Sequence, residues 1–284
     1  MARRDMALLV LLGAIWGAVY PLTTVVLREL SPAAVVLART ALSALVLMPL
    51  AARRHILRPA LDRPAAVTAA ALLQATIPLV LLTTGQQHVS AALAGILLAT
   101  QPVWAAVLTR ITGRAIRFRE LTGIMIGLGG IVVLYSRDLH FGAASGRGGL
   151  ELLAAAACYA AGAVYIQRVI PDVPPLATAT AAMTISAIAL APFAAATGFP
   201  IPGAVTTVWL VILAVVATGG ALVLFYTLIH RAGVVRANLA GYLAPALAIC
   251  YGYTFLGEPI HLQTLAALAL ILAGSYLAAM PAHA

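Results

Sequence analysis

Long apolar segments alternate with short polar links along the whole chain. Ten of these segments approach the length of about 20 residues that a membrane-spanning helix needs. The links contain helix-breaking prolines, as in Ser31-Pro32 and Glu258-Pro259. The pattern therefore predicts an all-α integral membrane protein with ten transmembrane helices. Their approximate limits are 6–27, 33–52, 65–85, 90–110, 119–136, 149–168, 175–197, 206–229, 235–256 and 262–280.

The composition agrees with a membrane protein, since 63% of the residues are hydrophobic and only 9% are charged. A mean hydropathy of +1.04 is higher than a soluble domain of this size needs. The chain starts like a signal peptide, with Arg3 and Arg4 ahead of an apolar run. Because this run continues to Leu27, it is too long for a signal peptide and is interpreted as the first membrane helix.

Arginine distribution predicts the orientation in the membrane. All seventeen basic residues are arginines, grouped in short clusters between the apolar segments. The net charge of +9 is compatible with nucleic-acid binding, but the positive-inside rule explains the clusters better, so no nucleic-acid partner is expected. Counted over alternate links, one side holds thirteen arginines and the other three. We therefore place the arginine-rich links and both termini in the cytoplasm.

The two halves of the chain resemble each other at a nearly constant offset. The tetrapeptide Gly-Ala-Val-Tyr at 17–20 recurs at 162–165, 145 positions later. This match, together with a pair of prolines 143 positions apart, indicates a duplicated five-helix unit, with repeats at 1–140 and 141–284. Because five is odd, the second unit has to enter the membrane upside down, which predicts inverted-topology repeats.

Each half also contains a proline inside an apolar segment, at Pro102 and Pro245, 143 positions apart. Proline removes a backbone donor, so we expect both helices to be kinked or loosened, with the two kinks facing each other. An ordinary membrane-helix kink is the alternative for either copy alone. We select the following candidate gating or hinge residues: Arg39, Pro102, Gly219, Gly220 and Pro245.

Polar and aromatic residues gather at the middle depth of several predicted helices. An uncharged polar group at this depth has to find a partner or line water, so each one alone is explained by packing or interhelical hydrogen bonds. As a set, they predict a cavity at the repeat interface that suits a small organic solute with polar and apolar parts. The candidate substrate-binding residues are Trp16, Tyr20, Gln74, Thr100, Gln101, Trp104, Tyr159, Tyr165, Asn238 and Tyr242.

Arg39 is the only charged residue that lies away from the ends of a predicted span. One interpretation is that its long side chain snorkels to the membrane interface. The alternative is that it binds a carboxylate or phosphate of the solute, or latches the outer gate. Its isolation from any acidic neighbour in the sequence motivates this second hypothesis.

Motifs for catalysis are missing from the sequence. It contains no HExxH, G-x-S-x-G or CxxC pattern, and every acid lies in a link or at a helix end. Cys158 and Cys250 form neither a disulfide framework nor a metal-binding spacing. We therefore expect no catalytic residue, no metal and no cofactor. A membrane-embedded lipid-modifying enzyme stays as the alternative from another class, and a channel would need a continuous polar stripe.

Several short motifs are spread along the chain: Trp16-Gly17 in the first helix, Leu-Ala-Arg at 37–39 in the second, and the blocks at 234–245 and 255–260. Together they resemble the EamA-type transporters of the drug/metabolite transporter superfamily. The resemblance extends over nearly the whole chain. It implies a bacterial inner-membrane carrier, often an exporter of amino acids or related metabolites, with a central cavity.

The resemblance and the residue pattern together predict a function. We expect a multi-pass secondary transporter of the bacterial inner membrane that exports small metabolites, with amino acids and in particular aromatic ones as the predicted solutes. It would work by alternating access through a central cavity, as a monomer within the lipid bilayer. A multidrug or quaternary-amine efflux carrier is the alternative within the same class.

Overall fold

The computed structural model describes residues 3–111, 118–135, 143–197, 200–232, 237 and 240–279. These residues form helices and connecting turns, with no strand among them. Two segments, η1 and η2, are π-helical. In chain order the elements are α1 (Arg3–Val26), α2 (Pro32–Arg53), α3 (Arg58–Leu61), α4 (Pro64–Ala71), η1 (Leu72–Thr76), α5 (Ile77–Gly85), α6 (Ala91–Leu98), α7 (Gln101–Ile111), α8 (Phe118–Tyr135), α9 (Ala143–Val169), α10 (Pro175–Thr197), α11 (Ala204–Val211), η2 (Ile212–Gly220), α12 (Ala221–Ala232), α14 (Ala240–Leu256) and α15 (Leu262–Ala279).

The predicted all-helical membrane architecture is confirmed. Among the described residues, six helices are long and apolar enough to cross a membrane. Shorter apolar helices lie at Leu93–Ala105, Leu243–Leu256 and Leu262–Gly274, so the total of ten spans stays a prediction. The six long ones are Arg4–Val26, Pro32–Arg53, Pro64–Gly85, Gly146–Val169, Pro175–Phe193 and Ala204–Ala232.

Local sequence explains where several helices begin. Pro32 and Pro64 occupy the first helical position of α2 and α4, where a backbone N–H has no intrahelical partner to lose. The hydroxyl of Ser31 accepts a hydrogen bond from Ala34 N at 3.3 Å, and the hydroxyl of Ser90 accepts one from Leu93 N at 3.2 Å. These caps satisfy free donors at the starts of α2 and α6.

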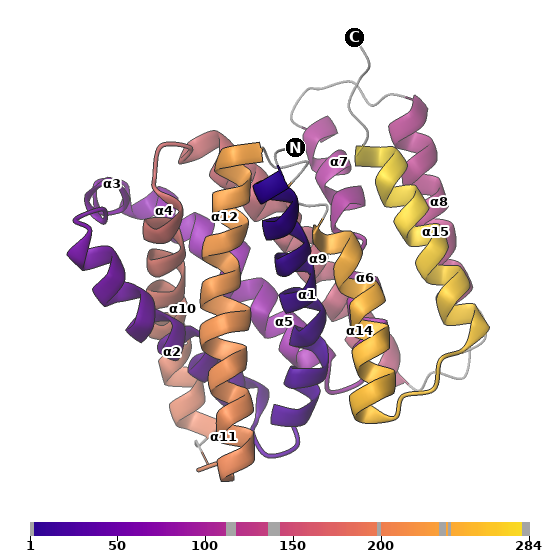
Figure 1. The fold of residues 1–284 in the computed structure, drawn as a ribbon, viewed down its shortest axis with the longest axis horizontal. Helices are drawn as coiled ribbons and strands as arrows, with labels where there is room; N and C mark the ends of the chain where they lie inside the picture. The colour runs from indigo at the N-terminus through magenta and orange to yellow at the C-terminus, as the bar shows by residue number, and fades with distance from the viewer. Residues whose placement is uncertain are drawn as a thin grey trace.

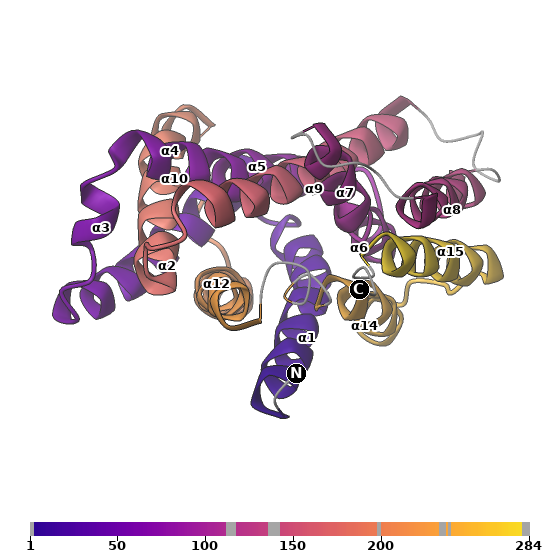
Figure 2. The ribbon, with the colours of Figure 1, turned by 90° about the horizontal axis from the view of Figure 1, so that it is seen from above.

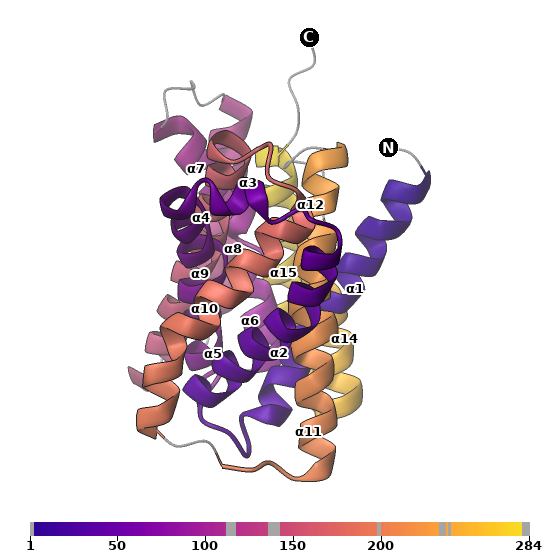
Figure 3. The ribbon, with the colours of Figure 1, turned by 90° about the vertical axis from the view of Figure 1, so that its left-hand side faces the viewer.

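Helices from the two halves pack side by side throughout the bundle. α8 lies against α15 at one edge, and α2 lies against α10 near the opposite edge (Figures 1 and 2). In the view onto that second edge, α10 passes in front of the bundle beside α2 (Figure 3). α1 packs on α14, and α5 packs on α9, so these four helices surround the middle of the molecule. Large apolar side chains such as Leu45 and Phe193 face outward, as expected for helices in lipid.

The two proline stretches differ in the structure. α6 ends at Leu98 and α7 begins at Gln101, so the expected break occurs in the first stretch. Pro102 stands in the first turn of α7 and therefore begins a helix rather than bending one. In contrast, α14 runs through Pro245 without interruption, so the expected kink in the second stretch stays a prediction. Pro245 is the sixth residue of α14, so its missing donor removes only one bond near the start of the helix.

The two stretches contact each other where α6 crosses α14, through Gly95 and Pro245. A Cβ atom placed on Gly95 of α6 would lie 3.4 Å from the Cα of Pro245 and 3.0 Å from the Cβ of Ala248. A Cβ atom would be tight at this crossing, and its neighbours would have to shift by a few tenths of an ångström to admit it. Gly95 thus allows α6 to pack directly on α14.

The π-helical segments interrupt one long helix in each half. η1 lies between α4 and α5, and η2 lies between α11 and α12. Each is held by a serine from the other half: Ser186 of α10 shares a 2.7 Å hydrogen bond with Thr76 of η1, and Ser43 of α2 donates to the Ala214 carbonyl at 2.7 Å. Because π-helical turns are rare and often occur at functional sites, these segments indicate a candidate functional region in the middle of the bundle.

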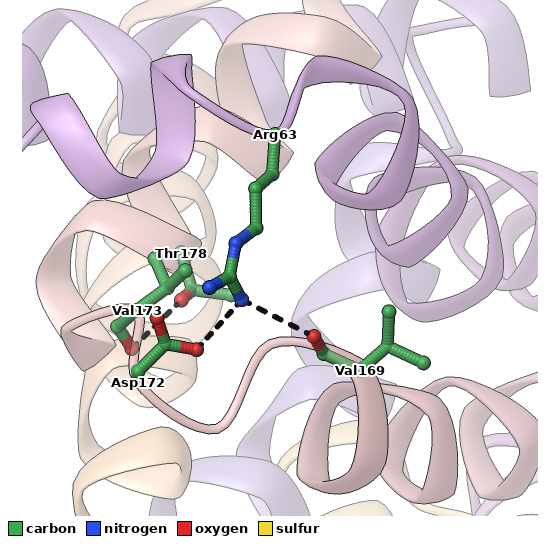
Figure 4. A network of polar contacts seen from close by, with 5 residues as sticks. All are labelled: Arg63, Val169, Asp172, Val173 and Thr178. Atoms are coloured by element: carbon green, nitrogen blue, oxygen red, sulfur yellow. Dashed lines mark hydrogen bonds and ion pairs between the residues drawn. The ribbon is translucent and has the colours of Figure 1, made fainter.

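Polar contacts join the links at each end of the bundle. At the end where α1 begins, Arg63 Nη1 donates to the Asp172 carboxylate at 2.8 Å and to the Val169 carbonyl at 3.5 Å (Figure 4). At the opposite end, where α11 begins, the Glu29 carboxylate accepts from Gly203 N at 2.7 Å and from the Thr206 hydroxyl. Each contact joins links that the arginine count places on the same side of the membrane.

Candidate functional site

A cavity of about 90 Å³ lies between the two halves, lined by side chains from both. It has room for several water molecules or a small solute. Trp16, Tyr20, Gln74, Gln101 and Tyr159 line it, so five of the ten candidate substrate-binding residues meet at one place. The remaining lining residues are Val19, Arg39, Ala75, Leu79, Leu82, Leu98, Met183, Ala217, Thr218, Leu222, Gly241 and Ala244.

Arg39 brings a positive charge to this cavity. Its side chain comes from α2 and is only 2% exposed, so the snorkelling interpretation is wrong. Nε donates to the Thr218 hydroxyl at 3.0 Å, whereas Nη1 has no hydrogen-bond partner among the described residues. None of the described residues that line the cavity is an Asp or Glu. Burying a cation without a counter-charge costs free energy.

Thr218 fixes the position of the Arg39 guanidinium. Its own hydroxyl donates to the Leu213 carbonyl at 2.7 Å, five residues earlier within η2. The Thr218 oxygen is therefore oriented to accept from Arg39 Nε. The π-helical segment of the second half thus holds the charged side chain of the first half.

Gln74 is a second polar residue of the cavity with an unused hydrogen-bond acceptor. It lies in η1, is 3% exposed, and its Oε1 has no hydrogen-bond partner among the described residues. A Cβ placed on Gly162 of α9 would lie 2.9 Å from the Gln74 Cβ, so α9 approaches η1 only because residue 162 is glycine. The Gly-Ala-Val-Tyr repeat at 162–165 therefore has a packing role beside the site.

Aromatic rings form the apolar part of the cavity wall. Trp16 and Tyr20 come from α1, and Tyr159 comes from α9. The ring of Trp16 packs against Phe225 of α12, with centroids 5.0 Å apart and planes inclined by 54°. This tilted contact packs the indole against the hydrophobic core beside the cavity.

Family comparison identifies the class of protein. The model of the EamA-like transporter family matches residues 5–136 and again residues 146–280. The chain belongs to the EamA-like transporter family. It is therefore a multi-pass membrane transporter with two repeat units, and the two matched ranges contribute Arg39 and Thr218 respectively to the cavity.

Two further comparisons concern this EamA-like transporter. Among the curated proteins, no sequence matches it. One solved crystal structure, described only as that of a protein, is similar over 98% of each chain with a TM-score of 0.71 and 17% identity. At this identity the likeness shows a shared fold alone, and the cavity has to be interpreted from its own residues.

Several candidate residues do not line this cavity. Thr100 is buried and donates to the Leu97 carbonyl at 2.7 Å, while Trp104 and Tyr165 pack against buried hydrophobic clusters. Asn238 lies outside the described residues, as do the side chains of Pro102 and Tyr242. The backbones of the last two lie in α7 and α14. Their contact with a solute stays a prediction.

The candidate hinge residues Gly219 and Gly220 lie at the end of η2. A Cβ placed on Gly219 would lie 2.9 Å from the Ser43 side chain, so this glycine allows η2 to pack on α2. The sequence pattern had not indicated Thr218, although it is a polar residue directly before this glycine pair in an otherwise apolar segment. Among the described residues, no three His, Cys, Asp or Glu side chains gather closely enough to hold a metal ion.

Proposed function

We propose that this EamA-like transporter exports small metabolites across the bacterial inner membrane by alternating access, with amino acids, aromatic ones in particular, as its solutes. The observation that carries the proposal is the central cavity, where Gln74, Gln101 and three aromatic side chains meet between the two repeats. A mixed polar and aromatic wall suits a solute with a polar end and an apolar body. The family places the activity among transporters.

Reciprocal helix contacts support an inverted arrangement of the two units, 1–140 and 141–284. α1 of the first unit packs on α12 and α14 of the second, and α9 of the second packs on α5 and α6 of the first. Reciprocal pairs arise when a two-fold axis exchanges the units, and the odd number of five predicted helices per unit requires that axis to lie in the membrane plane. Rocking one set of helices against the other would then open the cavity to one side at a time.

The contacts at the two ends act as the latches of this cycle. Glu29 bridges to Gly203 and Thr206 at one end, and Arg63 pairs with Asp172 at the other. Opening either end requires breaking the contact there. The start of α1 and the end of α15 lie at the Arg63 end (Figure 1), which supports placing both termini at the arginine-rich, cytoplasmic side.

Export from preloaded cells tests the proposal. Cells expressing the protein are loaded with labelled phenylalanine, tryptophan or leucine, and the rate of efflux is measured. We expect Gln74→Ala to lower the rate by about tenfold, because a buried hydrogen-bonding group contributes roughly 1–3 kcal/mol. Gln87→Ala is the matched control, since this amide is exposed in the turn after α5.

The outcomes separate the parts of the proposal. Efflux above that of empty cells, with Gln74→Ala impaired and Gln87→Ala normal, supports transport through the cavity. Equal rates for both variants contradict the assignment of the cavity as the solute path. No efflux of any of the three amino acids above empty cells contradicts the proposed solute class.

A further inference from the structure

We propose that the cavity binds organic anions through their carboxylate, with the Arg39 guanidinium as the receptor and the aromatic wall as the seat of an apolar body. This inference rests on the proposed function, because it takes the cavity to be the solute site. It goes further by assigning the chemical class: a carboxylate is required, whereas an ammonium group is not.

The charge balance of the cavity is the first argument. Arg39 is nearly completely buried, and among the described residues that line the cavity there is no acidic side chain to neutralise it. The described acids whose partners are known are engaged elsewhere, at helix ends: Asp5 with Arg231, Glu29 with Gly203 and Thr206, Glu151 with Arg147, Asp172 with Arg63, and Glu258 with Ala91 N. An anion that enters the cavity supplies the missing counter-charge. Its binding is therefore favoured by compensation of the buried charge of Arg39.

The hydrogen-bonding geometry is the second argument. A guanidinium group carries five N–H donors in a planar fork that matches a carboxylate. Thr218 uses the Nε donor, while the Nη1 donors remain unpaired among the described residues. The guanidinium group is thus held at Nε, and its Nη1 donors are left to bind a solute. A lysine would keep the charge but lose both the Thr218 contact and the fork.

The rest of the wall defines the remainder of the solute. Trp16, Tyr20 and Tyr159 offer apolar faces, and Gln74 Oε1 offers an unpaired acceptor. An amino acid can donate to this acceptor through its ammonium group, but the described lining residues include no carboxylate to pair with that charge. We therefore expect a carboxylate without an ammonium group to bind at least as well as the amino acid. The same body with only a positive charge should bind poorly, because Arg39 repels it.

Equilibrium binding to the purified full-length protein in lipid nanodiscs tests this order. The probes are L-phenylalanine, 3-phenylpropionate and L-phenylalaninamide, which share one ring but carry zwitterionic, anionic and cationic ends. The anion 4-methylpentanoate adds an aliphatic body. Calorimetry should give 3-phenylpropionate a Kd no higher than that of phenylalanine, and the amide a Kd at least about tenfold higher, as expected for a lost charged hydrogen bond.

Variants of Arg39 test whether this order of affinities depends on the Arg39 side chain. Arg39→Gln should weaken binding of 3-phenylpropionate by roughly tenfold to a hundredfold and remove the discrimination against the amide. Arg28→Gln is the matched control, since Arg28 is an exposed arginine in the link between α1 and α2. If Arg39→Gln does not fold, Arg39→Lys and Thr218→Val provide the same test, with a loss of several-fold expected for each.

Three results would overturn the inference. They are the failure of both anions to bind the wild-type protein, tighter binding of the amide than of 3-phenylpropionate, and unchanged anion affinity in the Arg39 variants. Counterflow in proteoliposomes separates this inference from the proposed function. Anion binding that depends on Arg39 without any counterflow contradicts transport and leaves the anion site intact. Counterflow of phenylalanine that is unaffected by Arg39→Gln supports transport and contradicts the anion site.

Discussion

The π-helical segments η1 and η2 occupy corresponding places in the two family repeats, yet they contribute differently to the cavity. Each is held by a serine of the opposite repeat, and these serines, Ser43 and Ser186, are 143 positions apart. The supporting contacts are thus duplicated along with the fold. Both repeats use a polar contact to hold a loosened helix against its neighbour.

The charged and amide groups of the cavity are not duplicated. Adding the same 143 positions to Arg39 and Gln74 leads to Ala182 and Ala217. The second repeat instead provides Thr218, which positions the arginine of the first repeat. The serines that hold the π-helical segments thus recur in both repeats, whereas the cavity has one charged side chain, from the first repeat. For the proposed solute site, this asymmetry predicts that a solute binds in a single orientation.

The largest effect is expected from closing the space beside the π-helical segments. Gly162→Ala and Gly219→Ala should each lower the free energy of unfolding by about 1–3 kcal/mol, because the new Cβ overpacks a tight helix crossing. Gly162→Ala should be worse, since its Cβ would meet the Gln74 backbone as well as its side chain, whereas Gly219→Ala meets only the Ser43 side chain and a more distant Leu47 methyl.

Circular dichroism during titration with SDS measures these differences in the purified protein. Gly129→Ala is the control, because a Cβ there meets nothing within 4 Å and alanine favours a helix. Equal stability of all three variants would show that the glycines beside η1 and η2 are not needed for the packing.

A smaller effect is expected from the two serines that hold the π-helical segments. Ser43→Ala should cost about 1 kcal/mol of unfolding free energy, as is typical for one buried hydrogen bond. Ser186→Ala should cost less, because Thr76 still reaches the Ala71 carbonyl at 3.4 Å. The same SDS titration measures both. Thr122→Ala, which removes a hydroxyl hydrogen bond within α8 alone, should be close to neutral. A larger loss of unfolding free energy for Ser186→Ala than for Ser43→Ala would contradict this order.

The smallest effect is expected at the latches, and it depends on pH. Hydrogen bonds from the Thr206 hydroxyl and Gly203 N lower the pKa of Glu29. Since its folded pKa lies below the unfolded value of about 4.3, these contacts stabilise the protein above that pH and are lost as the pH falls through the folded pKa. The midpoint of thermal unfolding should therefore fall less between pH 6 and pH 3.5 in Glu29→Gln than in the wild type.

Asp172→Asn provides the comparison at the other latch. This variant removes a half-exposed ion pair with Arg63, which contributes at most about 1 kcal/mol. It should leave the part of the pH response that comes from Glu29 unchanged. An identical pH response in Glu29→Gln and the wild type would show that the Glu29 contacts add nothing to stability.

Much of the architecture could be predicted from local patterns. Apolar segment lengths indicate membrane helices because the bilayer sets their length, and the family motifs identify the class. The mid-depth position of Trp16, Gln74 and Gln101 indicated a shared cavity, because an amide or indole at that depth needs polar surroundings. These inferences depend on one helix at a time, so they did not need the packing.

Other features could not be predicted, because they depend on contacts between distant segments. The burial of Arg39 follows from its bond to Thr218, 179 positions away, and no local pattern distinguishes it from a snorkelling arginine. The uninterrupted path of α14 through Pro245 and the π-helical form of η1 likewise depend on their neighbours. Thr100, in the turn between α6 and α7, and Trp104, on α7, share the depth of the cavity residues, but their side chains pack elsewhere.

The amino-acid sequence by itself determined that this chain is a helical membrane transporter built from two related units, because hydrophobic length and repeated motifs are properties of single segments. Only the tertiary structure decided which polar residues share the cavity, and that Arg39 enters it without a counter-charge. The physical reason is that burial and hydrogen bonding depend on what packs around a side chain. In this bundle, the other repeat supplies the residue that holds Arg39 in place.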